Sequence, residues 1–251
     1  MRIRLAFAAA AILTLALAAI LTLAGCDRLP GRPSAREEVV RPDQVLDFNT
    51  LYRENCSGCH GADGKGGASI ALRDPVYLAI ADDATIRNVA AGGVPGTQML
   101  PFAQGKGGML TGEQIGVLVQ GIRAWAQADV PRADVPRADV PRADAPRDGL
   151  PPYAAQSPGD PQRGAAVYAT FCAHCHGPNG QGGKGGSAIA NGAYLSLVSD
   201  QYLRTIVIAG RPELGAPDWR GDVTGRAMSA AEISDVVAWL ISQRPPSQRS
   251  N

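Results

Sequence analysis

Apolar residues recur at helical spacing in several parts of this chain. Residues 84–91 predict a short helix, and three further stretches each place their apolar residues on one helix face: Val45, Phe48, Leu51 and Tyr52; Ile115, Leu118, Val119 and Ile122; Ile233, Val236, Val237 and Leu240. The last two stretches follow Thr111 with Gln114 and Ser229 with Glu232, which have the spacing of a capping box at a helix start. The pattern predicts an all-α protein.

The helical pattern occurs twice along the chain. Five residues of the first half have counterparts displaced by 117 positions, pairing Tyr77, Arg87, Gly93, Pro95 and Phe102 with Tyr194, Arg204, Gly210, Pro212 and Trp219. Trp125 and Trp239 each lie near the end of the last helix predicted in their half. We expect the last helix of the first half to end near Trp125. The sequence therefore predicts two tandem copies of one small helical unit.

A repeated pentapeptide separates the two units. Ala-Asp-Val-Pro-Arg occurs three times and is followed by Ala-Asp-Ala-Pro-Arg. A proline at every fifth position forbids a continuous helix, so we expect an extended, semi-rigid spacer. The expected organisation is a signal peptide (1–25), a flexible tether (26–42), a first domain (43–127), a spacer (128–158), a second domain (159–244) and a C-terminal tail (245–251).

The N-terminus predicts export and attachment to a membrane. Arg2 and Arg4 precede an apolar run from Leu5 to Leu23, and small residues lead into Cys26. This is typical of a bacterial lipoprotein signal, in which Cys26 becomes lipidated; a single transmembrane anchor is the alternative. Both interpretations put the rest of the chain on the periplasmic side of a bacterial membrane.

Each unit begins with one kind of pentapeptide, Cys56-Ser57-Gly58-Cys59-His60 and Cys172-Ala173-His174-Cys175-His176. In C-x-x-C-H two thiols bond to the edge of a haem, and the following imidazole binds its iron. Residues three apart on a helical turn face the same way, so both sulfurs reach one ring.

The alternatives to haem attachment are weaker. A thioredoxin-like pair needs strands, which the surrounding pattern does not predict, and the two motifs lie much further apart than the halves of a zinc site. Two structural disulfides would not need the histidine at the fifth position of both motifs.

Composition agrees with covalent haem. Only 5% of the residues are aromatic, whereas 30 are Gly and 19 are Pro, so small, loop-rich cores need other apolar bulk, which haem supplies. The chain has 24 basic and 23 acidic residues, and this balance gives no sign of nucleic-acid binding. Its three lysines, Lys65, Lys106 and Lys184, argue against a dense lysine ring for redox partners.

These features resemble the class I c-type cytochromes. The resemblance rests on a helix leading into C-x-x-C-H, a glycine-rich loop, a methionine followed by proline and a terminal helix. It implies two cytochrome c-like domains with two covalently bound haems, held by Cys56, Cys59, Cys172 and Cys175, with His60 and His176 as proximal ligands. It also implies a tight crossing of the first and last helices, which the small Gly164 suits in the second domain, whereas Phe48 lies near that place in the first.

The family's sixth ligand is usually a methionine from the loop before the last helix. Met99 fits this role in the first domain; its rival, Met109, is expected to pack at the start of the terminal helix. In the second domain the 117-residue displacement places Ala216 at the ligand position, and Met228 corresponds better to Met109. Three outcomes stay open there: Met228 binds the iron, the iron has no protein ligand, or another side chain binds.

Two functions follow as hypotheses. The first is a membrane-tethered di-haem electron carrier that serves respiratory complexes such as a quinol-cytochrome c reductase, a dehydrogenase or a terminal oxidase, or is a subunit of one. The second is a haem enzyme or gas sensor that uses an open position on the second haem. Peroxide chemistry also needs an acid or base group, and the three histidines, His60, His174 and His176, all lie in the attachment motifs.

Overall fold

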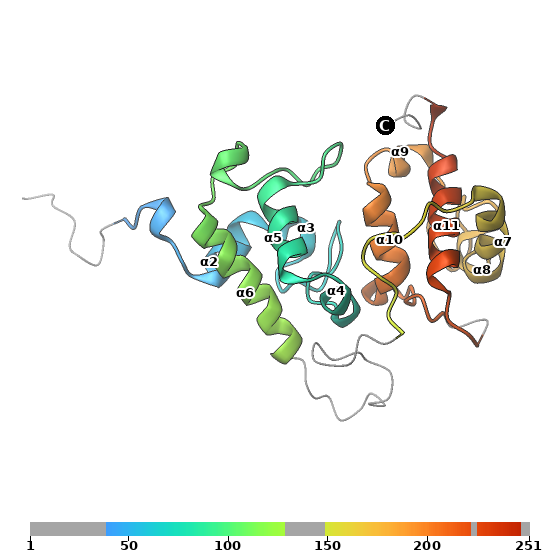
Figure 1. The fold of residues 1–251 in the computed structure, drawn as a ribbon, viewed down its shortest axis with the longest axis horizontal. Helices are drawn as coiled ribbons and strands as arrows, with labels where there is room; N and C mark the ends of the chain where they lie inside the picture. The colour runs from blue at the N-terminus through green and yellow to red at the C-terminus, as the bar shows by residue number, and fades with distance from the viewer. Residues whose placement is uncertain (1–38, 129–148, 222–224, 247–251) are drawn as a thin grey trace, which may run out of the picture. The chain divides into compact units, whose positions relative to one another are not determined.

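The computed structural model describes residues 39–128, 149–221 and 225–246, and over these ranges all regular elements are helices (Figure 1). The β-type pairings in these ranges are two isolated bridges, between Ala103 and Leu110 and between Arg211 and Ala216. The expected signal peptide, Cys26 and the four proline pentapeptides lie outside these ranges, apart from Ala128. No helix in the described ranges combines the length and hydropathy needed to cross a bilayer.

The first repeat, residues 45–128, contains four longer helices and two short elements, preceded by the 3₁₀ turn η2 (Pro42–Gln44). In chain order its elements are α2 (Phe48–Asn55), α3 (Ser57–His60), α4 (Pro75–Ile80), α5 (Asp83–Gly92), the 3₁₀ turn η3 (Gln104–Lys106) and α6 (Gly112–Ala128).

The second repeat, residues 159–246, has the same order of helices, but its 3₁₀ turn lies before Ala216, whereas η3 lies after Met99. Its elements are α7 (Pro161–Phe171), α8 (Ala173–His176), α9 (Gly192–Leu195), α10 (Asp200–Ala209), the 3₁₀ turn η4 (Pro212–Leu214) and α11 (Ala230–Ser242). The all-α prediction and the repetition of one unit are thereby confirmed.

The terminal helices form where the apolar stripes predict them. All eight stripe residues of α6 and α11 are at most 6% exposed. Both capping boxes are present: the Gln114 amide nitrogen donates to Thr111 Oγ1 (3.1 Å), and the Glu232 amide nitrogen donates to Ser229 Oγ (3.2 Å). Helix α6 continues three residues beyond Trp125, because the first proline that could end it is Pro131.

Two short helices were not predicted. Helix α4 begins after Asp74, whose side chain accepts from the Tyr77 amide (2.8 Å), and has Pro75 in its first turn. Every residue from Val76 to Ile80 is buried, so no period-3.6 pattern distinguishes it. Its counterpart α9 has only four residues and begins after Asn191.

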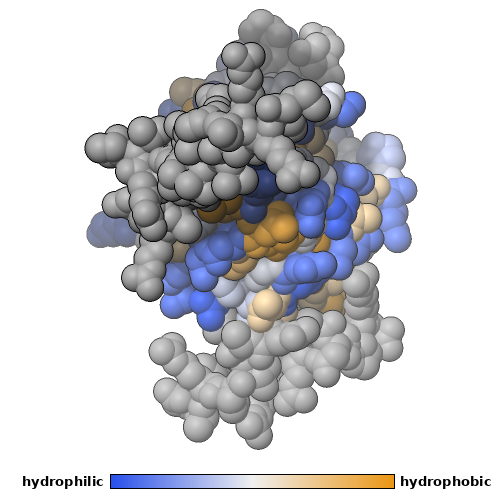
Figure 2. Space-filling view, turned by 90° about the vertical axis from the view of Figure 1, so that its left-hand side faces the viewer, coloured by the Kyte–Doolittle hydropathy of each residue, from blue (hydrophilic) through white to orange (hydrophobic). Residues whose placement is uncertain are grey.

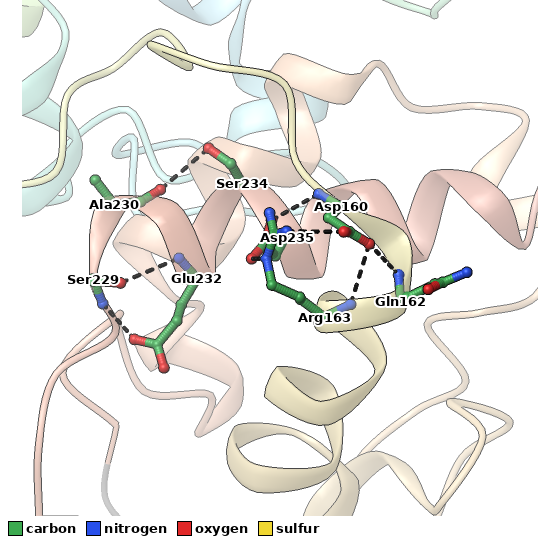
Figure 3. A network of polar contacts seen from close by, with 8 residues as sticks. All are labelled: Asp160, Gln162, Arg163, Ser229, Ala230, Glu232, Ser234 and Asp235. Carbon is green, nitrogen blue, oxygen red and sulfur yellow. Dashed lines mark hydrogen bonds and ion pairs between the residues drawn. The ribbon is translucent and has the colours of Figure 1, made fainter.

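The first and last helices of the second repeat cross at close range (Figure 1). A Cβ atom on Gly164 of α7 would lie 2.0 Å from the Asp235 carbonyl oxygen of α11, so only glycine permits this approach. Figure 3 shows the polar contacts beside the crossing: Arg163 Nε donates to Asp235 Oδ2 (2.8 Å), and the Asp160 amide donates to Asp235 Oδ1 (2.7 Å). The expected role of Gly164 is confirmed.

The first repeat replaces this contact with aromatic packing. The Phe48 ring of α2 lies against Gly121 of α6, where an added Cβ would be 2.0 Å from Phe48 Cδ2. Trp125 meets Phe48 and Tyr52 edge-on, with ring centroids 5.3 and 5.0 Å apart. The small residue is therefore on the last helix here and on the first helix in the second repeat.

Residues 149–153, within the expected spacer, contact the second repeat. The buried Arg204 of α10 donates from Nη2 to the Pro152 carbonyl oxygen (2.9 Å) and from Nε to the Tyr153 carbonyl oxygen (3.0 Å). Gln201 Nε2 donates to the same Tyr153 oxygen (2.8 Å). This segment is therefore fixed on α10.

The described residues on the face drawn in Figure 2 are largely hydrophilic. Figure 2 shows one face, on which a small group of apolar residues lies among hydrophilic ones. Seven large apolar side chains are exposed in the described ranges: Val39, Val40, Leu46, Leu100, Met109, Leu197 and Leu214.

Candidate haem sites

Each pentapeptide forms one helical turn at the end of the first helix of its repeat. Cys56 ends α2 and starts α3 with φ −121° and ψ −34°; Cys172 does the same between α7 and α8 with φ −121° and ψ −32°. In both turns the histidine amide donates to the first cysteine's carbonyl oxygen at 3.0 Å. The i, i+3 geometry that lets two sulfurs reach one ring is thus present in both repeats.

Both histidines are oriented by a backbone carbonyl. His60 Nδ1 lies 2.8 Å from the Ile70 oxygen, and His176 Nδ1 lies 2.7 Å from the Ser187 oxygen. Because a carbonyl only accepts, Nδ1 carries the proton and Nε2 keeps its lone pair for a metal. Burial lowers the pKa of His60, which favours the same neutral ring.

The glycine-rich loop shapes the space beside each histidine. It turns at Gly61 (φ +83°) and Gly177 (φ +77°), a region that only glycine enters without strain. The Gly66 amide returns to the His60 carbonyl (3.0 Å), as the Gly182 amide does to His176 (2.9 Å). Tyr52 and Tyr168 donate their hydroxyls to the turning glycine's carbonyl at 2.8 and 2.5 Å.

The cysteines do not have the properties of a redox pair. Burial, with a smaller effect of the second thiol, raises the pKa of both Cys56 and Cys172 to about 11. A thioredoxin-like cysteine needs a lowered pKa, because the thiolate is the reactive form. The four motif cysteines form no disulfide in the described ranges. Neither alternative is therefore favoured over haem attachment.

Met99 and Ala216 occupy matching positions in the loop after α5 and α10. The Val94 amide donates to the Met99 carbonyl (2.8 Å), and the Arg211 amide donates to the Ala216 carbonyl (3.0 Å). Val94 and Arg211 are also 117 positions apart, and both loop residues are half-buried. The backbone thus agrees with the sequence alignment at this point.

The structure corrects the expectations for Met109 and for the counterpart of Met228. Met109 is 80% exposed and so does not pack at the helix entrance; Leu110 does, at 6% exposed. The Leu110 amide donates to the Phe102 carbonyl (2.7 Å), and the Met228 amide donates to the Trp219 carbonyl (2.8 Å). Met228 therefore corresponds to Leu110. One extra residue after Trp219 changes the displacement from 117 to 118.

Each repeat contains an arginine, not identified from the sequence, that hydrogen-bonds to carbonyls in the middle of the repeat. Arg123 donates to the carbonyls of Leu78 and Ala81 and pairs with Asp83. In the second repeat Arg244 makes the corresponding contacts, to the carbonyls of Leu195 and Val198 (3.1 and 2.9 Å) and to Asp200 Oδ1 (2.6 Å). The acceptors are displaced by 117 but the arginines by 121, which hid the correspondence.

The residues present fit a covalently attached haem. Each repeat offers two unpaired thiols and an imidazole with a free Nε2 from a single helical turn. All-helical units of this kind, in tandem, define a di-haem c-type cytochrome.

Comparison with known proteins identifies the family. The family model described as cytochrome c oxidase, cbb3-type, subunit III matches residues 43–120 and 159–240, and the chain belongs to this family. It is an electron-transfer cytochrome with two covalently bound c-type haems.

Two individual proteins show more distant similarity. The cbb3-type cytochrome c oxidase subunit CcoP of Azospirillum sp. (strain B510) is 28% identical over 162 residues, which cover 58% of this chain and 45% of that protein. The chain thus matches less than half the length of this relative. A solved structure, the Kuenenia stuttgartiensis reducing HAO-like protein complex, aligns with 82% of this chain and 100% of its own at 18% identity, with a TM-score of 0.42.

Proposed function

We propose that this chain carries single electrons on the periplasmic side of a bacterial membrane, tethered through a lipid on Cys26, in association with a terminal oxidase. The observation that supports it best is the pair of equivalent turns, each with two thiols and an imidazole whose Nδ1 is held by a carbonyl. A bound haem supplies an iron that accepts and releases one electron.

The protein's part is to hold and orient. In this proposal Cys56 and Cys59, and Cys172 and Cys175, form the thioether bonds, while His60 and His176 bind the iron through Nε2. Their carbonyl partners fix each ring, as outer hydrogen bonds do for metal-bound histidines. Met99 would supply a thioether ligand to the first haem, and such a ligand would raise the reduction potential.

The name of the relative favours one partner over the others. That protein is a subunit of a cbb3-type oxidase, so we favour a terminal oxidase over a quinol-cytochrome c reductase or a dehydrogenase. The near balance of charges gives no reason to expect nucleic acid as a partner.

The test uses the full-length chain matured in a haem-competent periplasm. Its mass should exceed that of the polypeptide by two haems, both haems should titrate reversibly with one electron each, and an oxidase should co-purify. Cys26→Ser should move the protein from the membrane fraction to the soluble periplasm without changing its haem content. A colourless product, or a haem that does not titrate, contradicts the proposal; membrane retention of Cys26→Ser contradicts the lipid anchor alone.

One observation favours a second function, gas binding or peroxide reduction at the second haem. Ala216 replaces the methionine of the first loop. Peroxide reduction needs an acid or base group beside the iron, and all three histidines lie in the two attachment motifs. Gas binding is therefore the stronger form of this alternative.

A further inference from the structure

We infer that the second repeat gives its haem no side-chain ligand opposite His176, and that this position binds a small, neutral diatomic gas. The inference rests on the proposed haem attachment at Cys172 and Cys175. It selects one of the three ligand arrangements from the backbone position of Ala216 and the burial of Met228.

The loop after α10 resembles the loop after α5 in its backbone contacts. Arg211 and Ala216 pair through two backbone hydrogen bonds of 3.0 Å, and Gly210 lies close under the next peptide, as Gly93 does under Met99 and Leu100. The two loops therefore share the bond from Val94 to Met99, or from Arg211 to Ala216, and the close approach at the glycine, and the second loop has one further backbone bond. The second loop brings a methyl group, which has no donor atom, to the place of the Met99 side chain.

Met228 is a buried residue just before α11. Its side chain is 8% exposed and belongs to the buried core, directly before the capping residue Ser229. The same position in the first repeat is the buried Leu110, an apolar residue that cannot bind a metal. The first repeat thus uses this position for packing and presents its methionine from another loop. Because the backbone bonds of Leu110 and Met228 match, we assign Met228 to the core as well.

Side chains other than methionine can also bind haem iron. The sequence from Gly192 to Pro246 contains no histidine, cysteine or lysine. Its tyrosines, Tyr194 and Tyr202, are held protonated, because burial raises the pKa of each, to about 12 for Tyr194. A protonated phenol is a poor ligand, and His174 lies within the attachment turn itself. The segment from Gly192 to Pro246 therefore offers no histidine, cysteine, lysine or ionised tyrosine in place of the missing methionine.

The surroundings of Ala216 favour a neutral ligand. Its own side chain and the following Pro217 are apolar and offer no hydrogen-bond donor. Neither of these two side chains can compensate an anion or a peroxide for lost hydration, whereas a neutral diatomic molecule has little hydration to lose. Carbon monoxide is the suitable probe, because it reports an open position on ferrous haem directly.

The experiment titrates the reduced, haem-loaded full-length protein with carbon monoxide and follows its absorption spectrum. We expect one carbon monoxide per two haems, and a methionine–iron charge-transfer band in the oxidised protein from one haem only. Protein mass is measured on the same sample. Loss of covalent haem there would contradict the proposed function, whereas two haems with no gas binding would overturn the present inference alone.

Three variants assign the result to residues. Ala216→Met should abolish carbon monoxide binding and about double the charge-transfer band, because the half-buried position corresponds to that of Met99 in the first loop. Met99→Ala should raise binding to two per chain. Met228→Leu, which nearly conserves volume, should change neither quantity.

Each of three other results would contradict one of these ligand assignments. Carbon monoxide binding that increases in Met228→Leu would identify Met228 as the ligand and overturn the inference. Two molecules bound by the wild-type protein would overturn the assignment of Met99, and with it the contrast between the loops. Unchanged gas binding in Ala216→Met, with two haems present, would mean that Ala216 does not face the iron.

Discussion

The two repeats build the same attachment turn on different helix crossings. In the second repeat Gly164 lets two backbones touch, and the ion pair between Arg163 and Asp235 lies beside the contact. In the first repeat the glycine is Gly121, on the opposite helix, and the Phe48 ring fills the gap. In both repeats a backbone carbonyl holds the histidine Nδ1 although the helix crossings differ. The haem site therefore requires a particular attachment turn and loop, and it tolerates different packing between the first and last helices.

The largest expected effect separates the two attachment turns. Replacing Cys56 and Cys59 by alanine should leave one covalent haem per chain, and replacing Cys172 and Cys175 should do the same, because every hydrogen bond that orients the histidine comes from its own repeat. Intact mass and the haem absorption spectrum measure this. Loss of both haems from either variant would show that the repeats do not mature independently.

The next effect tests the helix crossings. Gly164→Ala places a methyl group against a backbone carbonyl that cannot rotate away, so we expect a loss of about 2 to 3 kcal/mol in the free energy of unfolding. Urea denaturation followed by circular dichroism measures it. Gly92→Ala is the control: it is also helical but has open space around it, and should change stability by less than about 0.5 kcal/mol.

The first repeat offers a second route to the same comparison. Gly121→Ala meets the ring of Phe48, a side chain rather than backbone. Combining it with Phe48→Leu should therefore cost less than the sum of the two single changes, by about 1 kcal/mol. Strict additivity would mean that the ring does not limit the approach of these helices.

The sequence predicted the features that depend on side-chain patterns and missed those that depend on backbone groups. The terminal helices followed from apolar stripes and capping boxes, and the attachment turns from cysteine spacing. The carbonyls of Ile70 and Ser187 could not be predicted, because a backbone acceptor has no side-chain signature. Met228 was placed against the wrong counterpart because one inserted residue shifts the register, which only the matching backbone bonds reveal.

A smaller effect is specific to the second repeat and depends on pH. The hydrogen bond from Arg163 lowers the pKa of Asp235, so this carboxylate stabilises the fold above its unfolded pKa and the contribution is lost as the pH falls through the lower folded value. Asp235→Asn should cost about 1 kcal/mol near neutrality, modest because the Arg163 side chain is 64% exposed. The first repeat has Val117 at this position.

The pH profile distinguishes this carboxylate from its neighbours. The difference in unfolding free energy between wild type and Asp235→Asn should be constant near neutral pH and shrink below about pH 4. Glu232, whose pKa the Arg226 side chain lowers to about 2, is present in both proteins and cancels. A difference that persists unchanged at low pH would mean that the asparagine acts through packing rather than charge.

The two repeats should differ least in how they respond to loss of the arginine that they share. Arg123→Gln and Arg244→Gln each leave two carbonyls without their donor, so both should lose about 1 to 2 kcal/mol in unfolding free energy, and by similar amounts.

The matched carboxylate changes show which contacts of each arginine matter. Asp83→Ala and Asp200→Ala should cost less than about 1 kcal/mol, because these side chains are 70% and 59% exposed and surface ion pairs contribute little. A larger loss from the arginine changes than from the aspartate changes would show that each arginine stabilises its repeat mainly through its hydrogen bonds to the carbonyls. If the aspartate changes cost as much as the arginine changes, the ion pairs to Asp83 and Asp200, rather than the hydrogen bonds to the carbonyls, carry the stabilising effect of the two arginines.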